Sequence, residues 1–580
     1  MKRIKKMLSI MLAMVMTLAM CSSVFAGSNT PGETGDFTIT IQDETAGYKY
    51  AAYQIFSGDL AINEDGTKTL SNIVWGNGVD EAKAKEAFSG QTAAQVAKSI
   101  AGKGNDSDDA KEFAAKIADC LGTVRAETSE KTEAGYVLGG LTAGYYLVQN
   151  LSVPATDGAF TRYILEVVGD VSPKPKRDIP TPDKKIVEGN NKVSVNEASI
   201  GDEVKYEITG TMPSNIGDYK TYYYKFTDTL SKGLTYKENS IKVTVNGIDV
   251  TNYFYKGVGT YSDTAGTEIE VSILDVKALS LLTDPAVGEI TKGTKVVLTY
   301  TATLNENAVI AGGGNPNDVK LSYSNDPNKS GNGATEPPKE NPEKPEPTTP
   351  IGESPKVEVV TYTTELTILK TNEEKAFLPG VEFTLTGSGV NVVLVTEERF
   401  EEAADGEYWK LTDNTYTKTA PTETETDAEG NVTVSGNTDK YASTTQKYKK
   451  ITSVVAKGTG KEETKVVGTV QADGTVTFKG LGAGEYTITE TKTLPGYNTI
   501  DPITFTLTFD ASKTPMFESN NNRVTVGADN MLDTSIENKK GSLLPSTGGI
   551  GTTIFYIVGA VLVIGAAILL VTKKRMSKEA

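Results

Sequence analysis

The stretch GLGAGEYTITE, residues 480–490, decides the fold. A Gly-rich turn opens it, and an alternating run follows in which Tyr486 and Ile488 share one face and the threonines share the other. Since successive side chains of a β-strand point to opposite faces, this run predicts a half-buried strand entered from a tight turn. The stretch GLTAGYYLVQN, residues 140–150, repeats its GLxAGxY pattern. We therefore expect the two regions to share a β-sandwich ancestry.

Most of the remaining chain follows the same rule. Short alternating runs are separated by Gly, Asn and Asp turns, which predicts a mainly β fold of tandem immunoglobulin-like β-sandwich domains. A chain of 580 residues has room for about three or four of them. The exception is residues 79–122, where apolar residues at helical spacing predict two inserted helices. Phe113, Ile117 and Cys120 share that spacing, so Cys120 is predicted to be a core residue.

Proline clusters punctuate the chain. The first, VSPKPKRDIPTPDKK at 171–185, marks the first domain boundary. A Pro/Glu-rich segment at 334–355 is interpreted as a linker or flexible loop. The polar, Thr-rich region 390–465 is interpreted as an insertion of ribbons and loops.

The two ends of the chain predict export and retention at a membrane. The basic MKRIKKM, the apolar LSIMLAMVMTLAM and the small-residue site VFA predict a signal peptide cut after Ala26. At the other end, residues 552–571 supply about the twenty apolar residues that a spanning helix needs. The tail KKRMSKEA keeps that end cytoplasmic. Between these features lies LPSTG: Leu544, Pro545, Ser546, Thr547 and Gly548.

Composition excludes several classes of function. The mature chain, residues 27–547, would keep 50 basic and 74 acidic residues, which argues against nucleic acid as a partner. The absence of histidine excludes Ser-His-Asp and Cys-His catalysis and histidine-based zinc sites. Only Cys120 remains after export, so no intramolecular disulfide is possible. We expect no cofactor and no metal; the Asp-rich stretch 104–109 is interpreted as a solvated turn in preference to a calcium site.

Three polar side chains stand at the ends of apolar stripes. By alternation, Lys370 shares a face with Ile368, Glu490 with Ile488, and Asn538 with Ile536. A lysine, an acid and an amide that meet in a core suggest chemistry, because burial lowers the pKa of a lysine and raises that of an acid. The amine attacks the amide carbonyl, the acid moves protons, ammonia leaves and an amide cross-link remains. Alternation alone leaves a second reading open, in which each group sits at a strand end in water.

A family resemblance favours the cross-link. LTILKTNEEKAFLPGVEFTLTG, GLGAGEYTITETKTLPGY and IENKKGSLLPSTGG resemble the collagen-adhesin B-type (Cna-B) domain of sortase-assembled pilins. That resemblance implies a bond between Lys370 and Asn538, with Glu490 as its catalyst.

The middle of the chain resembles the isopeptide-forming second (D2) domain of fimbrial backbone subunits. The motifs are IPTPDKKIVEGN, IGDEVKYEITG, KFTDTLSKGLTY and LSYSNDPN. The implied residues are Lys184, Asp228 and Asn325, and Lys185 is the second choice for the lysine.

The first region departs from the pattern. In FTITI, Ile41 stands where LTILK has its lysine, and Asn150 stands where the repeat has Glu490. We expect this region to lack the cross-link and to be the most labile. The resulting division is a signal peptide at 1–26, a pilin domain at 27–175, a D2 domain at 176–364, a Cna-B domain at 365–541 and a sorting signal at 542–580.

LPSTG before a span and a basic tail resembles the sorting signal of Gram-positive sortase substrates. The resemblance implies that a sortase cysteine attacks the carbonyl of Thr547 and releases Gly548 onward. The acceptor amine would be a lysine after the strand TRYILEVVGDV, where SPKPK offers Lys174 and, as second choice, Lys176. Ser172 stands where the family motif has tyrosine, which weakens this match.

Together these features predict a structural shaft pilin, not an enzyme with turnover. Its expected location is a cell-wall-anchored surface pilus, with the precursor held in the membrane by residues 552–571. Expected partners are a class C-type pilus sortase, a housekeeping sortase, other copies, minor pilins, peptidoglycan, and host or bacterial surface ligands. The alternative is a wall-anchored monomeric adhesin, or a basal or tip pilin.

Overall fold

The computed structural model describes most of the chain between the two processing signals. The described residues are 36–62, 66–103, 107–128, 131–175, 178–387, 392–421, 424–426, 432–434, 441–443, 445–458, 465–541, 559, 562, 563 and 566. The predicted signal peptide, LPSTG and Lys176 lie outside them, as does nearly all of the predicted span. Among the described residues, no helix has the length and hydrophobicity needed to cross a bilayer.

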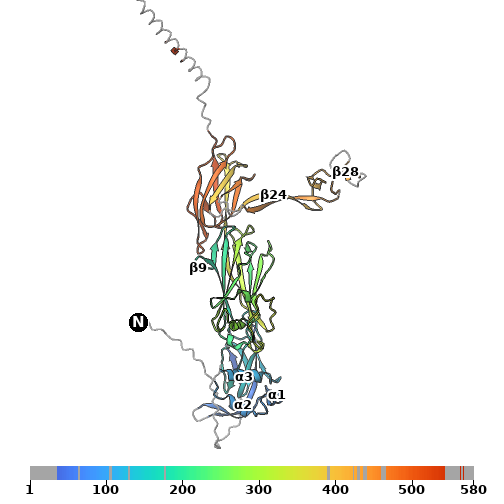
Figure 1. Ribbon diagram of the computed structural model, residues 1–580, viewed down its shortest axis with the longest axis vertical. Coiled ribbons are helices and arrows are strands. Elements are labelled where there is room, and N and C mark those ends of the chain that lie inside the picture. Colours follow the sequence, from blue (N-terminus) through green and yellow to red (C-terminus); the bar gives the residue numbers. More distant parts are fainter. Residues whose placement is uncertain are drawn as a thin grey trace, which may run out of the picture. The chain divides into compact units, whose positions relative to one another are not determined.

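Two compact units make up the chain (Figure 1). The first holds β1 to β21, and the second holds β22 to β36 together with the short segments Glu197–Gly201 and Ile310–Gly312.

The first unit begins with a small β-sandwich that carries helices. Its elements are β1 (Phe37–Ile41), β2 (Lys49–Ile62), β3 (Lys68–Trp75), α1 (Glu81–Ala87), α2 (Ala93–Ile100), α3 (Asp108–Ala118), β4 (Ala126–Glu127), β5 (Tyr136–Leu141), β6 (Gly144–Ser152) and β7 (Arg162–Val167). A five-stranded sheet has the order β3-β2-β6-β7, with β4 beside β2, and β1 pairs with β5 in a two-stranded sheet.

Three helices form in the described part of residues 79–122, where the sequence predicted two. The break falls after α1, where Gly90 adopts a positive φ of 76° that L-residues avoid. Thr92 then starts α2 with a capping box, in which its hydroxyl accepts from the Gln95 amide and the Gln95 side chain accepts from the Thr92 amide. Ser107 caps α3 in a similar way.

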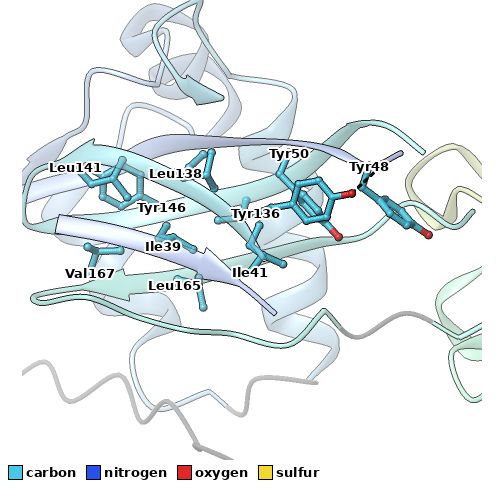
Figure 2. Packing of buried hydrophobic residues seen from close by; sticks show 12 residues of the cluster. Ile39, Ile41, Tyr48, Tyr50, Tyr136, Leu138, Leu141, Tyr146, Leu165 and Val167 are labelled. Carbon is cyan, nitrogen blue, oxygen red and sulfur yellow. Dashed lines mark hydrogen bonds between the residues drawn. The ribbon is translucent and has the colours of Figure 1, made fainter. Parts of the chain in front are cut away.

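Both faces of the five-stranded sheet are covered. One face packs against β1 and β5 around a core that contains Ile39, Ile41 and a group of tyrosines (Figure 2). The other face packs against the helices, and Phe113, Ile117 and Cys120 all lie in that second core. The predicted core position of Cys120 is confirmed: its thiol is buried.

The rest of the first unit is a sandwich of two seven-stranded sheets. Its strands are β8 (Thr181–Glu188), β9 (Asn191–Val193), β10 (Val195–Glu197), β11 (Glu203–Thr211), β12 (Tyr224–Leu230), β13 (Leu234–Tyr236), β14 (Lys242–Val245), β15 (Ile248–Asp249), β16 (Tyr255–Val258), β17 (Thr267–Ile273), β18 (Lys295–Leu304), β19 (Asn315–Ser324), β20 (Ile351–Glu353) and β21 (Val357–Tyr362). Short 3₁₀ helices are η1 (Ile216–Asp218), η2 (Thr251–Tyr253), η3 (Val276–Leu281) and η4 (Pro327–Lys329). One sheet has the order β10-β21-β19-β12-β17-β16, with β20 beside β19, and the facing sheet has the order β15-β14-β18-β11-β8-β9, with β13 beside β18.

The Pro/Glu-rich segment is a loop of this sandwich and not a linker. It lies between η4 and β21 and contains β20. The Asn341 amide donates to the Asn252 carbonyl at 2.6 Å, and Lys344 pairs with Glu270 at 2.8 Å.

The second unit is a sandwich with a long inserted ribbon. Its strands are β22 (Thr364–Asn372), β23 (Glu382–Gly387), β24 (Val392–Glu402), β25 (Trp409–Lys410), β26 (Tyr416–Thr417), β27 (Thr424–Thr426), β28 (Val432–Val434), β29 (Tyr448–Gly458), β30 (Lys465–Thr469), β31 (Thr475–Leu481), β32 (Gly484–Lys492), β33 (Ile503–Phe509), β34 (Phe517–Ser519), β35 (Thr525–Val526) and β36 (Leu532–Asn538). The sheets have the orders β29-β24-β31-β22-β36-β35 and β30-β23-β32-β33-β34. The hairpin of β24 and β29 projects from them, and β25 to β28 form small ribbons (Figure 1).

The sequence repeat is a structural repeat. In each copy a strand ends at a leucine, and after a two-residue turn the next strand begins at a glycine, Gly144 of β6 or Gly484 of β32. The tyrosine two residues on folds its hydroxyl back onto the turn: Tyr146 donates to the Thr142 carbonyl at 2.9 Å and Tyr486 to the Gly482 carbonyl at 2.8 Å. The same seven-residue pattern thus builds the same turn in both regions.

Candidate cross-linking sites

In the middle sandwich, a lysine lies between the two sheets. Lys184 of β8 is fully buried, and its amine donates to a carboxylate oxygen of Asp228 on β12, in the facing sheet. The same amine donates to the side-chain oxygen of Asn317 on β19 at 2.5 Å. Asp228 and Asn317 are also fully buried. An amine, an acid and an amide therefore meet in a dry core.

A tyrosine completes this cluster. The Tyr300 hydroxyl, on β18, donates to the second oxygen of Asp228 at 2.6 Å. It also accepts from the side-chain nitrogen of Asn317 at 2.7 Å. The rings of Tyr206 and Tyr300 lie beside the lysine amine, with their centroids 5.5 and 5.9 Å from Nζ.

Burial shifts the ionisation of the pair in the direction that the chemistry needs. Desolvation lowers the pKa of Lys184, although the Asp228 charge opposes it. Desolvation likewise raises the pKa of Asp228, against the effect of the lysine. Both shifts favour an uncharged amine, which is nucleophilic, beside a protonated acid.

The structure corrects the predicted asparagine. Asn325 is not beside Lys184: its side-chain nitrogen donates to the Gly158 carbonyl at 3.2 Å. Along β19 the residues that share the inward face include both Asn317 and Val319, and Val319 is the register partner of Asp228. Asn325 lies six residues beyond Val319, or about 20 Å along an extended chain. Alternation placed Asn325 on the correct face of the strand but could not show its position along the strand relative to Lys184.

The choice between the two adjacent lysines is clear in the structure. Lys184 points inward, whereas the Lys185 side chain is 32% exposed and pairs with Asp183 at 3.3 Å. Opposite faces of one strand thus separate a candidate nucleophile from a solvated charge.

The second unit brings together the three residues predicted for it. Lys370 and Asn538 are fully buried and lie on neighbouring parallel strands, with Lys370 in register with Ile536 and Asn372 with Asn538. Glu490, which is 5% exposed, reaches in from the facing sheet. Its carboxylate accepts from the side-chain nitrogen of Asn538 at 2.5 Å.

In this site the lysine amine is held by backbone. Lys370 donates to the Ile536 carbonyl at 3.2 Å and to the Thr371 carbonyl at 3.4 Å. Desolvation lowers its pKa to about 8, against the charge of Glu490. Thr493 gives the Asn538 nitrogen a second acceptor at 2.8 Å, and the buried Asn538 side-chain oxygen has no hydrogen-bond partner among the described residues. That oxygen is the atom on which negative charge would develop during attack.

The first region replaces all three groups. Ile41 lies in the core at the position of Lys370 (Figure 2). Asn150, at the position of Glu490, accepts from the Thr161 amide at 2.6 Å and from the Thr161 hydroxyl at 2.8 Å. The segment at Val171 pairs in parallel with β1, as β36 does with β22. Counting from the Ile39–Val171 bridge puts Pro175 at the position of Asn538.

Lys174 follows directly on this paired segment. The Thr40 amide donates to the Val171 carbonyl, and the Gln42 amide to the Pro173 carbonyl, both at 2.9 Å. Lys174 itself is exposed. Its backbone is therefore held by the sheet while its amine faces water.

The sequence-based reasoning missed Asn317 and Tyr300. Both lie on the inward face of alternating strands, Asn317 in NPNDVKLSYS and Tyr300 in KVVLTYTATL. A polar side chain on the otherwise apolar face of an alternating strand was the sequence signal that could have identified them. No group of acidic or cysteine side chains suited to hold a metal ion occurs among the described residues.

Three family models match the chain. Residues 200–327 match a Gram-positive pilin backbone subunit 2, Cna-B-like domain. Residues 437–523 match the SpaA prealbumin-like fold domain, and residues 536–578 match the LPXTG cell wall anchor motif. None of the curated proteins matches the chain.

Several solved structures resemble the fold. The T6 backbone pilin of serotype M6 Streptococcus pyogenes is 15% identical over 87% of this chain and 98% of its own, with a TM-score of 0.45. FimP from Actinomyces oris is 14% identical over 89% and 99%, with a TM-score of 0.43. The major pilin SpaD from Corynebacterium diphtheriae is 16% identical over 87% and 98%, with a TM-score of 0.41.

Proposed function

Because the chain is homologous to the backbone pilins of Gram-positive pili and carries an LPXTG cell wall anchor motif, we propose that it is the shaft subunit of a surface pilus. Its role is structural, and it is not an enzyme with turnover. The anchor motif makes it a cell-wall-anchored surface protein. Subunits are joined from Thr547 of one copy to Lys174 of the next, by a pilus sortase, and a housekeeping sortase transfers the base of the polymer to peptidoglycan.

Two internal amide cross-links stiffen each subunit. The observation that carries this part of the proposal is the pair of buried lysine–acid–asparagine clusters, Lys184 with Asp228 and Asn317, and Lys370 with Glu490 and Asn538. In each, the uncharged amine attacks the side-chain carbonyl carbon of the asparagine. The protonated acid gives a proton to the leaving nitrogen, the C–Nδ2 bond breaks, one ammonia leaves, and the acid regains a proton from the amine that attacked.

Intact mass spectrometry of the ectodomain, residues 27–541, tests the cross-links. The mass should fall short of the sequence mass by two ammonia molecules. Asn317→Ala and Asn538→Ala should each restore one, and Asn325→Ala should restore none. A mass equal to the sequence mass would remove this part of the proposal.

The polymer is tested in cells. Support comes from the exposed lysine that follows a sheet-paired segment, because its backbone is held while the amine is free to enter an enzyme. Lys174→Ala should abolish the high-mass ladder on an anti-subunit blot and leave anchored monomer with both internal bonds. Lys176→Ala is the matched control, since it removes a neighbouring charge.

The adhesin alternative is decided by the same blot. If the ladder survives Lys174→Ala, Lys176→Ala and the double substitution, neither lysine is the acceptor. If the wild type shows no ladder in wall extracts, the protein is a wall-anchored monomer, and a binding role takes precedence.

A further inference from the structure

We propose that Tyr300 is a catalytic residue of the Lys184–Asn317 cross-link, whose hydroxyl relays a proton from Asp228 to the departing nitrogen of Asn317. The inference rests on the proposed cross-linking and adds a residue to it. It is carried by the position of one hydroxyl group between the acid and the leaving group.

The hydrogen bonds define a chain. Asp228 uses one oxygen to accept from Lys184 and the other to accept from the Tyr300 hydroxyl at 2.6 Å. The Asn317 nitrogen donates to the same hydroxyl at 2.7 Å. Among the hydrogen bonds of the described residues, Lys184 links Asp228 to the side-chain oxygen of Asn317, and Tyr300 links Asp228 to the side-chain nitrogen. A proton passed from the acid to that nitrogen therefore has this hydroxyl as its path.

The steps balance with groups already present. The uncharged Lys184 amine attacks the Asn317 carbonyl carbon, which places positive charge on Nζ and negative charge on Oδ1. Attack frees the lone pair of Nδ2, so the Tyr300 hydroxyl turns from donating to Asp228 to donating to Nδ2. Protonated Asp228 then gives its proton to the Tyr300 oxygen as Tyr300 gives its own proton to Nδ2. The C–Nδ2 bond then breaks, ammonia leaves and the carbonyl reforms. Finally Nζ returns a proton to Asp228, so that the acid and the tyrosine end as they began.

The fold holds the hydroxyl in place. Tyr300 lies in the interior strand β18 in register with Tyr206 of β11, and their ring centroids are 5.2 Å apart. The side chain is 1% exposed. Burial first, and the Asp228 charge second, raise the pKa of Tyr300, so the hydroxyl keeps the proton that a relay must supply.

The second site serves as an internal comparison. There the carboxylate of Glu490 contacts the Asn538 nitrogen directly, and the other acceptor of that nitrogen is Thr493. The acid needs no intermediary at this site. A change at Tyr300 should therefore slow one cross-link and leave the other unchanged in the same molecule.

The experiment follows both bonds over time in ectodomain made by cell-free synthesis. Peptide mass spectrometry separates the Lys184–Asn317 product from the Lys370–Asn538 product. In Tyr300→Phe we expect the first bond to form roughly 100-fold more slowly, the scale of a lost proton transfer, and the second at the wild-type rate. Tyr206→Phe is the matched control, because its ring lies beside the same amine while, among the described residues, no hydrogen bond joins its hydroxyl to Asp228, the proton donor of the relay. Wild-type kinetics of both bonds in Tyr300→Phe would overturn the relay and leave the cross-link intact.

A second measurement covers the case in which Tyr300→Phe fails to fold. Ectodomain synthesised with 3-fluorotyrosine keeps the ring shape and has more acidic hydroxyl groups. The pH profile of Lys184–Asn317 formation should shift, while that of Lys370–Asn538 stays in place. Unchanged profiles for both bonds would rule out the relay. Absence of both bonds in the unlabelled wild type would instead refute the cross-linking proposal itself.

Discussion

The first and last sandwiches share a turn and differ in what they bury. In both, the GLxAGxY pattern builds the same strand–turn–strand with the tyrosine hydroxyl folded onto the turn. At three matched positions, however, Ile41, Asn150 and Pro175 stand where the last sandwich has Lys370, Glu490 and Asn538. One framework thus holds either an ordinary core or the residues of a candidate cross-linking site. Its turn and pairing belong to the fold, and three side chains decide the chemistry.

The largest expected effect comes from removing the acid of the last sandwich. Glu490→Ala should restore one ammonia to the intact mass, and hydrogen exchange should show a loss of about 5 kcal/mol in the opening free energy at β22 and β36. The reason is that a bond between residues 370 and 538 limits the unfolded chain as a long-loop disulfide does. Glu485→Ala, at an exposed position of the same strand, is the control and should change neither the ammonia deficit nor the opening free energy. A deficit of two ammonia molecules in Glu490→Ala would mean that the acid is dispensable.

Of the first and last sandwiches, only the last has a buried lysine among its described residues, and this lysine should make the rate of its cross-linking reaction depend on pH. The pKa of Lys370 is lowered to about 8, so the uncharged fraction of the amine grows as the pH rises toward that value. The rate of Lys370–Asn538 formation should increase about tenfold per pH unit below pH 8 and level off above it. The measurement is a cell-free time course with Asn317→Ala, which lacks the other bond. A flat profile from pH 6 to pH 9 would contradict a role for the free amine.

A smaller effect is expected at the matched position of the first sandwich. Asn150→Ala removes the acceptor of the Thr161 amide and hydroxyl and should cost about 1–3 kcal/mol, because buried donors lose their partner. The thermal midpoint of the variant should fall, and its deficit from its own sequence mass should stay at two ammonia molecules. Gln149→Ala, the neighbouring and less buried position, should be close to neutral. A deficit smaller by one ammonia in Asn150→Ala than in the wild type would show that this region holds a cross-link after all.

The smallest effects should be similar in the two regions. Tyr146→Phe and Tyr486→Phe each remove the hydrogen bond that the hydroxyl donates to a turn carbonyl, worth about 0.5–1.5 kcal/mol. Tyr146→Phe also removes the hydrogen bond that the same hydroxyl accepts from the Thr142 amide at 3.2 Å. Hydrogen exchange at β6 and β32 measures the two losses side by side, and both variants should keep the wild-type deficit of two ammonia molecules from their own sequence masses. A several-fold difference between them would show that the shared turn is not energetically equivalent.

Much of this architecture was predictable because strand alternation is a local property. The predicted β-sandwiches, the inserted helices, the buried Cys120 and the inward-facing Lys370, Glu490 and Asn538 all follow from periods of two or of about 3.6 residues. The helix count was wrong by one, because the break depends on Gly90 and on a capping box at Thr92. Both features depend on one or two residues, and the periodic pattern of apolar residues does not reveal them.

The sequence by itself determined which face of each strand a side chain occupies, and the tertiary structure decided the register in which the strands pair. Asn317 and Asn325 share a face of one chain segment, so alternation could not separate them. The pairing of Val319 with Asp228 brings Asn317 to Lys184 and leaves Asn325 near Gly158. The contact between Tyr300 and both Asp228 and Asn317 likewise requires two facing sheets at one register. Register is set by pairing between residues far apart in the chain, and no local period encodes it.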